Sequence, residues 1–141
     1  MSAMPVTVES LLAFFRSAPF MVELGIEPVE CSDGLVVTHM PIAERHLQHT
    51  GQVHAGVSGA LADHTMGAAA QTLLPVGHWA ITAEFKTSLL RPGRGQRLEC
   101  IGTVIKPGRQ VMFTEAEVYA IDGEARTLVA KASATMAVVK A

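Results

Sequence analysis

The C-terminal half of the chain alternates apolar and polar residues over long stretches. From Trp79 to Leu89, apolar side chains alternate with a polar set that includes Thr82, Glu84 and Lys86. The same period of two recurs over residues 97–104, 112–118 and 128–136. Such alternation is typical of strands with one buried face, so four long strands are expected here. Turn residues at 91–94, 106–109 and 122–124 predict that successive strands form antiparallel hairpins.

The N-terminal half predicts two further strands and two helical segments before a long helix. Residues 8–15 have helical spacing with Thr7 as a candidate N-cap, and Pro19 limits this helix. Residues 21–24 suit a second short turn, and strands are expected at 26–31 and 35–40 around the turn at 32–34. A polar, His-rich loop over 41–53 then leads to a helix from 54 to about 74, ended by the Pro-Val-Gly of 75–77.

The long helix is apolar nearly all round and built from small residues. Glycine costs about 1 kcal/mol relative to alanine inside a helix, so Gly59 and Gly67 indicate close packing against a neighbouring element. A helix without a polar face is normally buried. The order of elements therefore favours an α+β fold, with an antiparallel sheet curled around one central helix. Residues 1–141 are expected to form one domain.

Composition narrows the possible partners. Hydrophobic residues make up 49% of the chain and charged residues 17%, which suggests that a second subunit covers some apolar surface. The net charge of -2 gives no general attraction to nucleic acid or to an acidic membrane. Cys31 and Cys100 have no redox or zinc spacing and are expected to be reduced packing thiols. No signal peptide or membrane-spanning stretch is evident, so we expect a cytoplasmic protein.

One acid interrupts the apolar helix. Asp63 is the only carboxylate between Glu44 and Glu84. A carboxylate in such surroundings is paired, protonated or functional, unless it reaches solvent or caps nearby backbone.

The residues around Asp63 resemble the motif of the hotdog-fold acyl-CoA thioesterases, in particular the PaaI-type and 4-hydroxybenzoyl-CoA branches. That motif is Asn or Gln, a Gly three residues later, His-Gly-Gly, and an acid nine residues after the His. The matching positions are Gln48, Gly51, His54-Ala55-Gly56 and Asp63, and the strand ending in Leu90-Arg91-Pro92 is also similar. Two positions depart from it, since Ala55 replaces the first Gly and Gln48 stands where many members have Asn.

The resemblance implies hydrolysis of an acyl-CoA thioester to a free acid and coenzyme A. Asp63 would be the general base or nucleophile, and the Ala55 N–H at the helix start would stabilise the oxyanion. Gln48 would orient the carbonyl or water, and Thr82 would hold the water. His54 and Gly56 complete the helix-start motif, with His54 favoured for shaping the turn over proton transfer. No cofactor is expected, because coenzyme A is part of the substrate.

Helix geometry adds a requirement for a second subunit. Ala55 and Asp63 are eight residues apart, or about 12 Å along a helix at 1.5 Å per residue. One thioester carbon cannot lie within hydrogen-bonding and attack range of both groups. If both act, the site combines two chains, as in this family. We therefore expect a homodimer that pairs further into a homotetramer.

Other polar residues are weaker candidates for binding a metal or the coenzyme A phosphates. His46, His49 and His64 are metal-ligand types, but no third ligand has a usual spacing, so no metal is expected. Arg109 is the first candidate and Arg91 the second for contacts with the coenzyme A phosphates.

Two other functions remain open at this stage. The chain could bind acyl-CoA without catalysis, or it could be a dehydratase or hydratase of the same fold. The sequence does not define the acyl group, so aryl, short-chain and medium-chain substrates are all possible.

Overall fold

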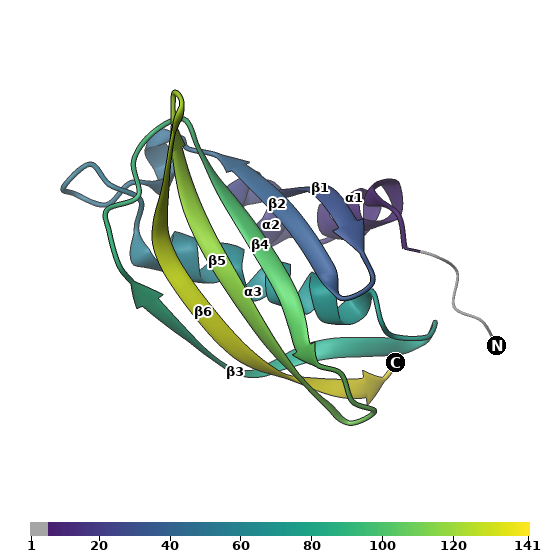
Figure 1. The fold of residues 1–141 in the computed structure, drawn as a ribbon. Helices are drawn as coiled ribbons and strands as arrows, with labels where there is room; N and C mark the ends of the chain where they lie inside the picture. The colour runs from purple at the N-terminus through teal and green to yellow at the C-terminus, as the bar shows by residue number, and fades with distance from the viewer. Residues whose placement is uncertain (1–5) are drawn as a thin grey trace.

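The computed structural model describes residues 6–141 and consists of a curved sheet with a long helix on its inner side (Figure 1). The helices are α1 (Val8–Arg16), α2 (Pro19–Leu24) and α3 (Ala55–Gln71), with a 3₁₀ turn at Glu44–His46. The strands are β1 (Glu27–Ser32), β2 (Leu35–Pro41), β3 (His78–Leu89), β4 (Arg97–Lys106), β5 (Val111–Asp122) and β6 (Ala125–Lys140).

The sheet is fully antiparallel in the order β1-β2-β4-β5-β6-β3. Helix α3 packs against β2 to β6, and Leu61, Met66 and Ala69 of α3 are fully buried in the core. The expected hotdog arrangement of a curled sheet around one central helix, preceded by a short N-terminal helix, is confirmed. Thr7 caps α1 as predicted, because its side chain accepts from the Ser10 N–H.

One connection differs from the prediction. Residues 91–94 do not form a hairpin, because β3 pairs with β6 at the sheet edge and not with β4. Alternation along a strand reports which face is buried, but not which strand lies beside it. The connection instead crosses the end of the sheet, where the Gly93 carbonyl accepts from the Val53 N–H at 2.9 Å. This crossing places residues 90–93 beside the start of α3.

Strand β3 also departs from strict alternation. A bulge between Thr82 and Glu84 shifts the register against β6. Thr82 pairs with Met136 and Phe85 with Ala134, both buried partners, while Ile81 pairs with Ala137. Because residues paired across strands share a face, Thr82 and Phe85 both face α3. The period of two that was expected from 79 to 89 therefore changes phase in the middle of the strand.

Two glycines of α3, Gly59 and Gly67, are not explained by close packing within one chain. A Cβ built on Gly59 would meet the Phe85 ring at 3.6 Å, and one on Gly67 would meet Met136 at 4.0 Å, both ordinary contacts. Close packing of the sheet within one chain therefore does not require these glycines. The close approach lies at Gly102 of β4, where a Cβ would come within 2.8 Å of the Thr65 carbonyl oxygen.

Strand β3 leaves an apolar sheet edge uncovered. Trp79, Ile81, Phe85 and Leu89 are each between 41 and 56% exposed in the single chain. Long, apolar edge strands favour pairing with another chain. Among the described residues, no helix is long and apolar enough to cross a membrane.

Candidate active site

The first turn of α3 offers one free backbone donor. His54 is the N-cap, and its Nδ1 accepts from the Gly56 N–H at 2.8 Å. The N–H groups of Val57 and Ser58 donate to the His54 carbonyl at 2.9 and 3.3 Å. The Ala55 N–H finds no acceptor among residues 6–141. Free N–H groups at a helix start favour negative charge, so Ala55 is suited to binding a developing oxyanion.

His54 therefore shapes the helix start through a backbone hydrogen bond, which is the role favoured from the sequence over proton transfer. The same hydrogen bond engages the Gly56 N–H, which leaves Gly56 without a free backbone donor for a ligand.

The loop before α3 holds Gln48 beside this turn. Residues Leu47 and Val53 pair as an isolated antiparallel bridge, and the Gln48 N–H donates to the Gln52 carbonyl at 2.8 Å. Gly51 closes the loop with φ of 83°, a conformation that favours glycine. The Gln48 side-chain amide makes no hydrogen bond within residues 6–141 and is free to contact a ligand.

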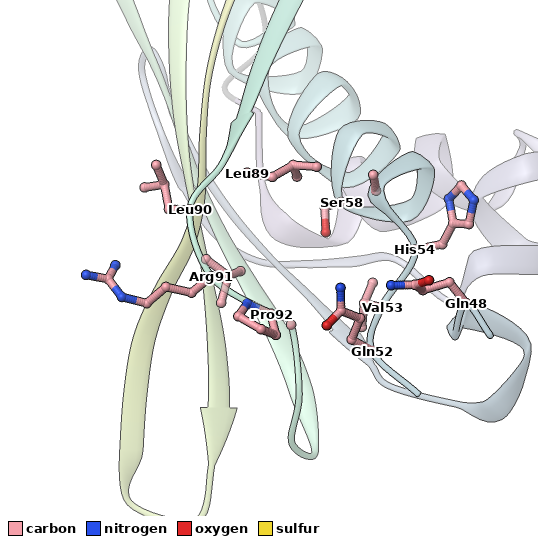
Figure 2. A pocket seen from close by; sticks show the side chains of 12 residues that line it. Gln48, Gln52, Val53, His54, Ser58, Leu89, Leu90, Arg91 and Pro92 are labelled. Carbon is pink, nitrogen blue, oxygen red and sulfur yellow. The ribbon is translucent and has the colours of Figure 1, made fainter. Parts of the chain in front are cut away.

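These groups line a cavity of about 460 Å³ between the start of α3 and the end of β3. Figure 2 shows Gln48, Gln52 and Ser58 around it, with the apolar residues of 89–90 on the opposite wall. The remaining lining residues are Val53, His54, Ala55, Arg91, Pro92, Gly93 and Val129. Amides, one hydroxyl and one backbone donor thus converge on a partly apolar space, as in a small-molecule site.

Asp63 lies outside this cavity and is bonded to Thr82. The Thr82 hydroxyl donates to Asp63 Oδ1 at 2.6 Å. The other carboxylate oxygen, Oδ2, has no hydrogen-bond partner in the described part of the chain. This contact depends on the β3 bulge, which turns Thr82 towards α3. Thr82 thereby fixes the carboxylate and leaves one oxygen free.

The predicted site residues thus form two groups that lie apart in the single chain. Gln48, His54 and Ala55 meet at the cavity, whereas Asp63 lies two turns further along α3, where Thr82 of β3 donates a hydrogen bond to it. Because α3 is one uninterrupted helix, the estimated separation of about 12 Å between Ala55 and Asp63 holds. One chain does not bring its own carboxylate to its own free N–H.

The two arginine candidates lie at opposite ends of the sheet. Arg91 lines the cavity rim, but its Nη1 donates to the Leu128 carbonyl at 3.0 Å and its guanidinium extends away from Ser58 (Figure 2). Arg109 is exposed next to Gln110, whose carbonyl accepts from Val138 at the far end of β6. Leu90, next to Arg91, donates a backbone hydrogen bond to Val129 of β6. Val129 and Val138 are nine residues apart on this strand, or about 30 Å at 3.3 Å per residue. This distance separates the two arginines.

His46 and His64, two of the metal-ligand types named from the sequence, pack inside the chain. His46 is buried, with Nδ1 accepting from the Ala43 N–H and Nε2 donating to the Leu24 carbonyl, and burial lowers its pKa. His64 packs edge-on against Phe15, and burial lowers its pKa to about 4. No group of three or more metal-ligating side chains occurs among residues 6–141.

Sequence reasoning passed over several cavity residues. Gln52 and Leu89 occupy positions that the motif does not specify, although each lies next to motif residues. Ser58 lacks a neighbouring base that would mark it as a nucleophile in the sequence. Its position three residues after Ala55, on the same helix face, was the signal that could have linked it to the cavity.

Comparisons with known proteins agree on one family. The model of the thioesterase superfamily matches residues 50–127. A thioesterase family protein from Silicibacter pomeroyi is 29% identical, with a TM-score of 0.89 over 92% of this chain and 95% of that one. The Haemophilus influenzae thioesterase HI1161 is 26% identical, with a TM-score of 0.88 over 97% and 93%. The Bacillus halodurans protein BH2602, solved with CoA, is 26% identical, with a TM-score of 0.69 over 72% and 70%.

Proposed function

The chain belongs to the thioesterase superfamily, and we propose that it hydrolyses acyl-CoA thioesters at a site shared between two subunits. The observation that carries this proposal is that one helix presents both a free Ala55 N–H at the cavity and, two turns away, an oriented Asp63 carboxylate. The choice of CoA is supported by BH2602, a similar protein solved with CoA.

The chemistry follows from the free groups. The Ala55 N–H and the positive end of α3 stabilise the oxyanion that forms as the thioester carbonyl is attacked. Gln48 orients the carbonyl through its unbonded amide. Asp63, fixed by Thr82, either takes a proton from the attacking water or attacks the carbonyl carbon itself. The C–S bond then breaks. In the first case the sulfur takes the proton that Asp63 accepted and leaves as the coenzyme A thiol. In the second case the sulfur leaves as a thiolate that is protonated by solvent, and water hydrolyses the acyl–Asp63 anhydride to the free acid.

The shared site requires a particular dimer. An antiparallel partner helix alongside α3 brings the second Asp63 to the first Ala55. The face of α3 that is least covered carries Gly56, Ala60, Asp63 and Gly67, which leave room for such a helix. Pairing of β3 with its own copy would also cover the apolar edge at Trp79 and Ile81. Gly67, which packing within one chain does not explain, thus has a reason in the dimer.

A panel of acyl-CoAs tests the proposed function. Benzoyl-, acetyl-, hexanoyl- and dodecanoyl-CoA would be incubated with the protein, and released thiol would be read with a thiol reagent. Release above the uncatalysed rate is expected for at least one acyl class. Tight acyl-CoA binding without thiol release would identify a binding protein instead. Loss or gain of a C=C bond in enoyl- or hydroxyacyl-CoA would identify a hydratase or dehydratase.

Arg109 is expected to bind the coenzyme A phosphates from the partner subunit. The antiparallel dimer brings the Arg109 end of one sheet to the Arg91 end of the other. Because Arg109 is remote from the reacting carbonyl, Arg109→Ala is expected to raise KM for the best acyl-CoA while leaving kcat nearly unchanged. Steady-state kinetics on the CoA ester and on the matching S-acyl pantetheine measures this.

The pantetheine ester lacks the nucleotide phosphates, so its KM should change little in the Arg109→Ala protein. Arg94→Ala, another exposed arginine in a turn, is the matched control. If Arg109→Ala weakens both esters equally, the side chain does not contact the phosphates.

A further inference from the structure

Ser58 is a mostly buried residue whose hydroxyl has no hydrogen-bond partner among the described residues and reaches the cavity. The residue is only 5% exposed, yet its hydroxyl makes no hydrogen bond within residues 6–141. Buried hydroxyls on helices usually bond the carbonyl one turn back. Thr65 of the same helix does so, donating to the Leu61 carbonyl at 2.7 Å. The Ser58 hydroxyl opens onto the cavity instead and is free to pair there with a ligand or water.

The hydroxyl faces the cavity. Ser58 is a lining residue, and Figure 2 shows its oxygen directed from α3 into the space above Gln52. Helical side chains tilt towards the N-terminus and cover the preceding turn. The Ser58 side chain therefore covers the turn that begins with the free Ala55 N–H.

The start of α3 also lacks a second backbone donor. Oxyanion sites usually direct more than one donor at the developing charge. Here the neighbouring N–H, that of Gly56, is held by His54 Nδ1. On α3 itself, a single backbone N–H and one free hydroxyl remain, one turn apart on the same face, beside the Gln48 amide of the preceding loop.

We propose that the Ser58 hydroxyl is a second hydrogen-bond donor to the thioester oxygen, acting beside the Ala55 N–H. Ser58 is a stabilising group here and not a nucleophile, so no covalent bond to it forms. This inference rests on the proposed function and adds a catalytic residue to it. It also assigns the carbonyl, and not the acyl chain, to the part of the cavity between Ala55 and Ser58.

Ser58→Ala and Ser58→Cys variants of the full-length protein test the proposal. Removing one oxyanion donor typically lowers kcat about 10²-fold, so Ser58→Ala is expected to lower kcat to this extent with little change in KM. The Cys variant has a somewhat larger side chain with a weaker donor and should fall between Ala and wild type. Thermal unfolding checks the fold, which Ala at a helix position should preserve.

Binding of two inert analogues separates this role from packing. Phenacyl-CoA keeps the carbonyl of benzoyl-CoA but has a methylene before the sulfur, and phenethyl-CoA lacks the carbonyl oxygen. Calorimetry should show that Ser58→Ala weakens phenacyl-CoA binding about tenfold or more and leaves phenethyl-CoA unchanged, as expected for one lost hydrogen bond. Equal weakening of both, no weakening of either, or a wild-type protein that binds the ketone no better than the thioether would overturn the proposal.

The two hypotheses fail separately. Absence of thiol release by the wild-type protein from every acyl-CoA overturns the proposed function. The ketone and thioether affinities still report on Ser58 in that case, because neither analogue needs to react.

Discussion

Replacement of Asp63 by Asn is expected to lower kcat for the best acyl-CoA by about 10² or more, the scale of a positioned acid–base group. The side-chain volume is kept, and the Asn oxygen can still accept from the Thr82 hydroxyl that now bonds Asp63 at 2.6 Å. The fold should therefore survive while the basic and nucleophilic oxygen is lost. Steady-state thiol release, with thermal unfolding as a check of the fold, measures the effect.

A Thr82 pair provides the control for Asp63→Asn. Thr82→Val removes the hydroxyl that orients Asp63 and should lower kcat less than Asp63→Asn does. Thr82→Ser keeps the hydroxyl and should retain most of the activity. A folded Asp63→Asn protein with near-normal turnover would remove Asp63 from the mechanism.

Mixing two inactive chains is expected to restore activity. In a heterodimer of Asp63→Asn and Gln48→Ala chains, one site combines the intact Gln48 of the first chain with the intact Asp63 of the second. Each heterodimer should therefore have about half the activity of the wild-type dimer, since one of two symmetric sites is intact. The mixture would be unfolded and refolded together, and differently tagged heterodimers would be isolated before the assay.

The reverse pairing makes this test decisive. A heterodimer of a wild-type chain with the double variant Gln48→Ala/Asp63→Asn should be nearly inactive if sites are shared, because each site then lacks one group. If each chain holds its own complete site, the heterodimer with the wild-type chain should be active and the heterodimer of the two single variants should be inactive. Activity in the second heterodimer and none in the first would thus reject the shared site.

The regular elements were accessible from the sequence because local patterns specify them. The small apolar run of α3, the Thr7 cap of α1 and the alternation in β4 to β6 each depend on neighbours a few residues away. The partner of β3 was not accessible, because strand pairing depends on how the whole sheet curls. The phase change in β3 was also missed, since an extra residue in a bulge has no strong local signature.

The candidate site divides in the same way. Asp63 was visible as a lone charge, and the helix start was visible through His54, Ala55 and Gly56. The Asp63–Thr82 hydrogen bond could not be derived from periodicity, which placed Thr82 opposite the apolar face that contains Phe85. The significance of Ser58 depends on the folded structure, in which its hydroxyl faces the cavity without a hydrogen-bond partner from residues 6–141.

The bulge at Ala83 limits how the length of this chain can change during evolution. It divides β3 into two halves whose inward-facing residues are out of phase, with Thr82 in the first half and Phe85 in the second. Loss of one residue here would turn either Thr82 away from Asp63 or the half from Glu84 to Leu89 away from the cavity. Insertions and deletions are tolerated in hairpin loops, such as Asp122–Ala125, where no side-chain phase has to be kept. In β3, one alanine with no chemistry of its own keeps Thr82 and Phe85 on the same face of the strand, towards α3.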